Sequence, residues 1–189
     1  DPKVYEKAKE LLKARLADHT YVTDDDQSYY LYQLTLDGRS QTGIVACCSI
    51  DDYVSGVIKK HENTREEKEQ DRIRHVDVMN AQTGPIFLAY RQNEVLGQIM
   101  EERPLYDFVS EDGIGHRVWK VRKAEQNQKI EAVFAQVPAT YIADGHHRAA
   151  SAVKVGLKRR QENPDYTGTE PFNYFLSVLF PEDQLMIMP

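Results

Sequence analysis

The stretch TYIADGHHRAASAV, residues 140–153, joins an apolar run to an alanine-rich run through a short polar turn. Apolar residues that end at Ala143 and small residues that start at Ala149 predict a buried strand followed directly by a helix. The intervening Asp-Gly-His-His-Arg contains a glycine, which favours a tight turn. The segment therefore predicts a strand, a turn and a helix over residues 140–162, with the reactive side chains in the turn.

The turn at residues 144–148 has the chemistry of an anion site. The first N–H groups of a helix and the helix dipole favour negative charge, and phosphate is the usual ligand. Gly145 allows close approach to the backbone, Arg148 can form a bidentate contact, and His146 and His147 can donate hydrogen bonds. The alternative is that Asp144 only caps the helix and that His-His-Arg is exposed surface.

A metal site formed by Asp144, His146 and His147 is a further alternative for the same turn. Adjacent histidines rarely face one ion, and no third strong ligand follows at helical spacing. We therefore predict no resident metal in the turn. Mg²⁺ is expected only as the companion of a nucleotide, because it needs one or two carboxylates and the phosphate oxygens.

A second polar segment, KKHENTREEKEQDR, covers residues 59–72. His61 and Glu62 lie beside Asn63 and Thr64, which places a base and hydrogen-bonding groups at a predicted helix end. A solvated, charged helix face would explain the same run. If the segment is functional, Glu62 is expected to serve as a general base or as a magnesium ligand, with His61 orienting it.

The rest of the chain predicts an α+β domain with a mixed or antiparallel sheet and flanking helices. Asp37-Gly38 between alternating apolar residues predicts one hairpin, and residues 112–115 predict the turn of a second. These hairpins argue against a doubly wound parallel fold. Apolar spacing predicts helices over residues 3–18, 51–82 with an interruption around 61–64, 94–102 and 125–136, and strands over 85–90, 172–180 and 184–188.

Composition narrows the class of protein. With 189 residues, of which 41% are hydrophobic and 29% charged, the chain is typical of one water-soluble domain. Its net charge of −6 argues against broad binding of nucleic acid, and no apolar run approaches the roughly 18 residues of a membrane span. Cys47 and Cys48 lie together in an apolar run, which predicts core residues and a reducing, cytoplasmic compartment. The abrupt ends predict that residues 1–189 are a single domain cut from a longer protein.

Two long motifs carry a family resemblance. YIADGHHRAASA (141–152) and VIKKHENTREEKEQDR (57–72) resemble the paired signatures of a widespread bacterial and archaeal family of unknown function, marked by Ala-Asp-Gly-His-His-Arg. GPIFLAY (84–90) and FNYFLSVLF (172–180) also match runs of that family, so the resemblance extends from about Tyr30 to the end. This family is similar to the ParB and sulfiredoxin-like superfamily, whose members carry a Gly-x-x-Arg turn before a helix.

The resemblance implies a ParB/sulfiredoxin-like core with insertions and a phosphate-binding turn. In sulfiredoxins this turn holds ATP, in ParB proteins it holds CTP, and in free serine kinases it serves ADP-dependent phosphoryl transfer. Carried over to this chain, the phosphate-binding residues are Gly145, His146, His147 and Arg148, preceded by Asp144. A sulfiredoxin has its catalytic cysteine where this chain has His146, so reduction of sulfinic acids is not expected.

We therefore expect a nucleotide-binding protein that takes ATP, ADP or CTP with Mg²⁺ and a small-molecule substrate. The first hypothesis is a phosphotransferase in which Glu62, His61 and Asp144 are catalytic. The alternative is a non-catalytic, nucleotide-sensing ParB-like module that engages a protein or DNA partner. Because phosphoryl transfer needs a carboxylate near the phosphates, the position of Glu62 relative to the turn discriminates between them. The acceptor, the nucleotide and the oligomeric state are left open.

Overall fold

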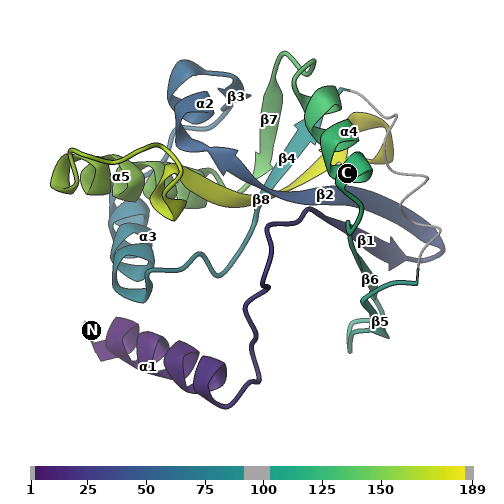
Figure 1. Ribbon diagram of the computed structural model, residues 1–189, viewed down its shortest axis with the longest axis horizontal. Coiled ribbons are helices and arrows are strands. Elements are labelled where there is room, and N and C mark those ends of the chain that lie inside the picture. The colour runs from purple at the N-terminus through teal and green to yellow at the C-terminus, as the bar shows by residue number, and fades with distance from the viewer. Residues whose placement is uncertain (1–2, 92–102, 186–189) are drawn as a thin grey trace.

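The computed structural model describes residues 3–91 and 103–185, which form helices around one mixed sheet (Figure 1). This architecture confirms the predicted α+β class. The helices are α1 (Lys3–Ala17), α2 (Ile50–Ser55), α3 (Glu66–Met79), α4 (Ala124–Phe134) and α5 (His146–Glu162), with 3₁₀ turns η1 (Pro171–Asn173) and η2 (Glu182–Gln184). The strands are β1 (Tyr30–Leu36), β2 (Arg39–Ser49), β3 (Ile58–Lys59), β4 (Ile86–Tyr90), β5 (Tyr106–Val109), β6 (Gly115–Lys120), β7 (Thr140–Asp144) and β8 (Tyr174–Pro181).

The eight strands lie in the order β3-β7-β4-β8-β2-β1-β6-β5. β3 runs parallel to β7 and β4 runs parallel to β8, while the other neighbours are antiparallel. Both predicted hairpins are confirmed, as β1–β2 and β5–β6. Asp37 and Gly38 have φ values of 49° and 77°, the left-handed pair that a tight two-residue hairpin needs.

The predicted helical region 51–82 differs from the structure in its middle. α2 ends at Ser55, and the next residue, Gly56, has a φ of 80°, the left-handed conformation typical of a helix C-terminus. The chain then enters β3, where Ile58 is buried, and α3 begins only at Glu66. The interruption is therefore longer than predicted and contains a strand. A two-residue strand has no periodicity of its own, so its pattern is hidden in the sequence.

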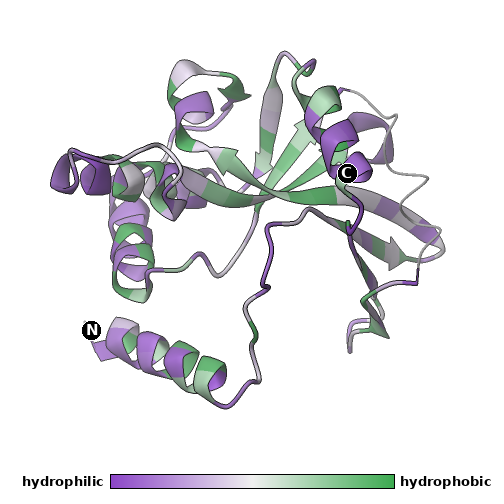
Figure 2. Cartoon of the chain, viewed as in Figure 1, coloured by the Kyte–Doolittle hydropathy of each residue, from purple (hydrophilic) through white to green (hydrophobic). Residues whose placement is uncertain are grey.

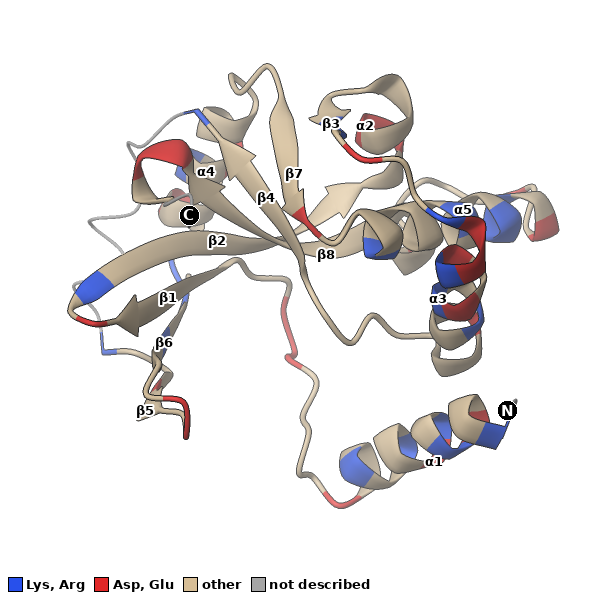
Figure 3. Cartoon of the chain, turned by 180° about the vertical axis from the view of Figure 1, so that it is seen from behind, with Lys and Arg blue, Asp and Glu red and all other residues tan. Residues whose placement is uncertain are grey.

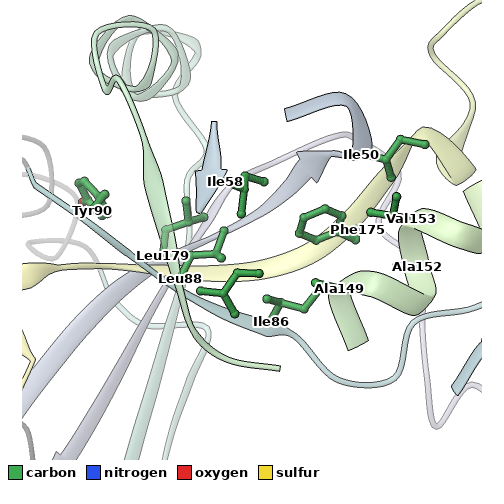
Figure 4. Packing of buried hydrophobic residues seen from close by; sticks show 11 residues of the cluster. Ile50, Ile58, Ile86, Leu88, Tyr90, Ala149, Ala152, Val153, Phe175 and Leu179 are labelled. Carbon is green, nitrogen blue, oxygen red and sulfur yellow. The ribbon is translucent and has the colours of Figure 1, made fainter. Parts of the chain in front are cut away.

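The core has two parts. The larger one lies between α5 and the strands β4, β7, β8 and β3, and Figure 4 shows its side chains meeting over the sheet. α5 contributes Ala149, Ala152 and Val153, small residues that let the helix approach the sheet closely. The smaller part packs Ile130 of α4 against Leu31 and Trp119 of the sheet. Figure 2 shows the corresponding pattern, with hydrophobic strands and helices that are mostly hydrophilic outside.

α1 stands apart from this core and is joined to β1 by a long connection (Figure 1). It contains no buried residue and contacts α3 through the side chains of Tyr5 and Asp71. Within residues 3–91 and 103–185, no helix combines the length and the apolar character that crossing a membrane requires. The predicted helix at 94–102 lies outside the described residues. The predicted strand at 184–188 also lies mostly outside them, and Gln184 belongs to η2.

The two cysteines differ from the prediction that both are core residues. Cys48 packs against the larger core, whereas Cys47 is exposed, since successive residues of a strand point to opposite faces. Burial raises the pKa of both thiols, and that of Cys48 to about 12. Neither has the lowered pKa of a nucleophilic cysteine.

Candidate functional site

The two polar motifs of the sequence meet at one edge of the sheet. β3 and β7 are parallel neighbours, with Ile58 opposite Thr140 and Lys59 opposite Tyr141. The segments that follow two parallel strands leave the sheet at the same end. His61 and Glu62 follow β3, and the turn into α5 follows β7, so the short strand that sequence reasoning missed brings the motifs together.

The turn before α5 begins a long helix without a side-chain cap. Gly145 is the N-cap residue, with a φ of 95°, and no side chain of the described residues caps the helix there. A residue with a Cβ is strained at this φ, which explains the glycine. The alternative in which Asp144 is the N-cap is therefore wrong. The first N–H groups of this 17-residue helix have no partner within the helix itself, and no described side chain caps them.

Arg148 closes over this turn. Its Nη2 donates to Oδ2 of Asp144 and its Nη1 donates to the carbonyl oxygen of Pro85, each at 2.6 Å. A Cβ on Gly145 would lie 3.2 Å from Nε and Nη2 of Arg148, so the guanidinium lies directly against the glycine. Asp144 is 71% exposed and Arg148 is 36% exposed, so this ion pair stays accessible to a competing anion.

His146 and His147 point to different neighbours. Adjacent helical residues project about 100° apart, which separates their rings. Nε2 of His147 accepts a hydrogen bond of 3.1 Å from the backbone N–H of Arg65, tying the turn to the start of α3. His146 is buried, and its ring meets that of His61 edge to face at 4.4 Å between centroids. The alternative ligand set of Asp144, His146 and His147 is therefore not gathered around one point.

The imidazole of His146 instead faces the other motif. Its Nδ1 lies 3.7 Å from Oε2 of Glu62, and Nε2 of His61 lies 3.8 Å from Oε1 of the same carboxylate. Burial, together with the neighbouring His61, lowers the pKa of His146, although Glu62 and Asp144 oppose this shift. This direction favours the neutral form of the ring. Its Nε2 is buried and has no hydrogen-bond partner among the described residues.

A polar pocket of about 270 Å³ opens beside His146. Its lining residues are Tyr53, Lys60, His61, Glu62, Asn63, Thr64 and His146. Sequence reasoning missed Tyr53 and Lys60, although Lys60 directly precedes His61. The ammonium of Lys60 lies 4.7 Å from the ring centre of Tyr53, which places a cation in the wall. Asp144, Gly145, His147 and Arg148 adjoin this pocket through the turn but do not line it.

A larger hollow of about 660 Å³ lies elsewhere, between α1 and α3. Exposed residues such as Lys7, Glu10 and Arg74 line it, and none of the predicted site residues does. Figure 3 shows that charged residues gather on α1, α3 and α5, so a charged lining there is a property of these helix surfaces. We assign the site to the smaller pocket, where the two motifs converge.

Glu69 of α3 links the residues of the pocket to α5. Its buried carboxylate accepts hydrogen bonds from the hydroxyl of Thr64 and from the ammonium of Lys154 on α5. Burial acts to raise the pKa of Glu69, but Lys154 and Thr64 outweigh it and hold the pKa below its ordinary value. The hydroxyl of Ser151 also donates to the backbone oxygens of His147 and Glu69. Residues 60–65 between β3 and α3, the pocket loop, are thus joined with α3 and α5 at one buried carboxylate.

Comparison with known proteins places the chain in a family of unknown function. No curated protein and no solved structure gives a match. A family model described as "Protein of unknown function (DUF1015)" matches residues 1–189, and therefore includes both motifs and every element of the site. Because this match covers the entire chain, the protein belongs to the DUF1015 family of proteins of unknown function.

Proposed function

We propose that the protein binds a nucleotide through its phosphates at the N-terminus of α5. The observation that carries this proposal is the start of α5. Gly145 is its N-cap residue, no described side chain caps the helix, and the guanidinium of Arg148 lies against Gly145. Free N–H groups, the helix dipole and a guanidinium together favour a phosphate group. Lys60 in the adjoining pocket adds a further positive charge.

A divalent cation belongs to this proposal because of the local charge. Glu62 and Asp144 both lie next to the turn, and their carboxylates repel a phosphate. Mg²⁺ carried by the nucleotide neutralises this repulsion and takes carboxylate and phosphate oxygens as ligands. The residues fit such a complex, since Glu62 is exposed and Asp144 is an exposed carboxylate paired with Arg148. Binding is therefore expected to be tighter with Mg²⁺ than without it.

The reaction we propose is phosphoryl transfer to a small molecule. In such a reaction an acceptor hydroxyl loses its proton, its oxygen attacks the terminal phosphorus, and the bond from that phosphorus to the bridging oxygen breaks. Glu62 lies against His146, the first residue of α5, so a carboxylate stands beside the proposed phosphate site. It supplies the base or the metal ligand of the reaction, and His61 orients it from 3.8 Å.

The fold relationship is part of the same proposal. We assign the core to the ParB/sulfiredoxin-like superfamily, on the strength of the Gly-x-x-Arg turn from Gly145 to Arg148 between a strand and a helix. Members of that superfamily bind nucleotide phosphates at this turn. Function resides in the site rather than in the fold, so binding must be measured on this chain.

Isothermal titration of the chain with ATP, ADP, CTP and pyrophosphate, with and without Mg²⁺, tests the proposal. Arg148→Ala should weaken binding about tenfold or more, the effect of losing a charged hydrogen bond. Lys158→Ala is the matched control, because it removes one positive charge from the same helix, where Lys158 pairs with Asp77. Absence of binding by the unmodified chain, or equal weakening by both substitutions, refutes the phosphate site.

Glu62→Gln separates the enzyme from the sensing module. With the nucleotide bound, transfer of the terminal phosphate is followed by ³¹P NMR in the presence of candidate hydroxyl acceptors. A phosphotransferase loses turnover in Glu62→Gln, while nucleotide binding in the absence of Mg²⁺ persists. Binding without turnover in the unmodified chain across those acceptors favours the non-catalytic module.

A further inference from the structure

We propose that His61, Glu62 and His146 form a binding site for a first-row transition-metal dication such as Zn²⁺. Among the described residues, these three place one possible ligand atom each within 4.8 Å of one another. Two imidazoles and one carboxylate are a ligand set that suits Zn²⁺ and its first-row neighbours better than Mg²⁺. The inference stands apart from nucleotide binding, because the site would take the metal alone.

The distances suit ligands around an ion better than hydrogen-bonded side chains. The carboxylate of Glu62 lies 3.8 Å from Nε2 of His61 and 3.7 Å from Nδ1 of His146, beyond hydrogen-bond reach. Two ligands at about 2.1 Å in a tetrahedral site stand roughly 3.4 Å apart. The three ligand atoms lie within 4.8 Å of one another, so the separations must shorten by at most about 1.4 Å to reach a tetrahedral site. The exposed side chains of His61 and Glu62 leave room for that movement.

His146 supplies the fixed part of the site. Its side chain is only 4% exposed, and its Nε2 has no hydrogen-bond partner among the described residues. A buried polar nitrogen without a partner is unfavourable. Nδ1 is the ring nitrogen that faces Glu62, so a metal bound there would leave the ring proton on Nε2. The buried ring thus provides a rigid ligand, to which the two exposed ones can close.

Three protein ligands leave coordination positions for another molecule. The same three side chains line the polar pocket, so a metal held by them stands in its wall. Water or an anionic oxygen would complete its coordination, as in catalytic zinc sites with open positions. The class of ligand that this metal would take is an oxyanion, because Lys60 lies in the same pocket.

Titration of the metal-free chain with Zn²⁺, and with Co²⁺ as a spectroscopic probe, tests the inference in the absence of nucleotide and phosphate. We expect one equivalent of metal. His61→Ala and Glu62→Gln should each weaken binding by at least the 10–100-fold that is typical of losing even an outer-shell partner. Both positions are exposed, so these variants should fold, and thermal unfolding checks that they do.

Two control variants decide between alternative ligands. Asp144→Asn removes the carboxylate of the turn, and His19→Asn removes an exposed histidine far from the pocket. Both should bind Zn²⁺ as the unmodified chain does. The inference is overturned if the chain binds no metal, if either pocket substitution leaves the affinity unchanged, or if Asp144→Asn weakens binding as much as Glu62→Gln.

Discussion

The substitution Glu69→Gln tests whether one buried carboxylate holds the site together. Glu69 is 4% exposed, and it joins Thr64 of the pocket loop to Lys154 of α5. In glutamine a single amide oxygen must serve both donors, and the new NH₂ group lies buried beside an ammonium. The change therefore removes a charge-assisted network while keeping the size of the side chain.

The expected loss of stability lies between two limits. Breaking a fully buried ion pair costs about 3–5 kcal/mol, and an exposed pair contributes about 0–1 kcal/mol. The Glu69 carboxylate is buried but Lys154 is 52% exposed, so the ammonium can turn to water. We expect a loss of about 2 kcal/mol in the free energy of unfolding, or about 4–8 °C in Tm for a domain of this size.

Urea denaturation at pH 7 measures this loss, with Asp77→Asn as the matched control. Asp77 also joins α3 to α5, through Lys158, but both of its partners lie on α5 and its carboxylate is partly exposed. The control should lose less than about 1 kcal/mol. The reasoning is refuted if Glu69→Gln loses no more than Asp77→Asn.

The pH dependence of the same difference has a definite sign. The folded pKa of Glu69 lies below its ordinary value, so its contribution is present above the ordinary carboxyl pKa of about 4.3. That contribution is lost as the pH falls through the lower, folded pKa. The stability gap between the unmodified chain and Glu69→Gln should therefore narrow below about pH 4.

Three further predictions concern other parts of the fold. Gly156→Ala should lower the free energy of unfolding by about 1–3 kcal/mol, measured by urea denaturation, because the new Cβ would lie 2.4 Å from the carbonyl oxygen of Phe172. This loss should outweigh the higher helix propensity of alanine, and unchanged stability would contradict the close approach. Hydrogen bonds from backbone N–H groups lower the pKa of Glu170 to about 2. Glu170→Gln should therefore be less stable than the unmodified chain at pH 7, and this difference in stability should disappear as the pH falls from about 4 towards 2. In the folded chain a thiol reagent should modify Cys47 faster than Cys48, whose pKa of about 12 and burial keep it protonated; equal rates, measured by mass spectrometry, would contradict the placement of Cys48.

Local pattern was sufficient to predict much of the fold. The glycine turn before α5, both hairpins and most boundaries follow from residue types within a few positions of one another. The divergence of His146 and His147 also follows from helix geometry. Helix geometry does not predict which of the two rings is buried, because that depends on His61 and Glu62, which lie more than 80 positions away in the chain.

The part of the site that sequence reasoning missed depends on long-range pairing. The sequence pattern at residues 61–64 predicted a helix end. The motif lies beside the turn only because β3 pairs with β7, which the pattern did not predict. Tyr53 lies in α2 and Lys60 directly follows β3, so these two pocket residues flank the strand on either side in the chain. Neither β3 nor its pairing leaves a periodic signal in the sequence.

The strand β3 has a consequence for the solubility of the protein. It is the outermost strand at its end of the sheet, and it covers the backbone of Thr140 and Tyr141 in β7. An uncovered strand edge is a template for pairing with another chain, and short edge strands carrying lysine discourage such pairing. A change that pulls Lys59 and its neighbours away to enlarge the pocket therefore also opens β7 to self-association. Changes at Ile58 and Lys59 that widen the pocket would therefore also favour aggregation.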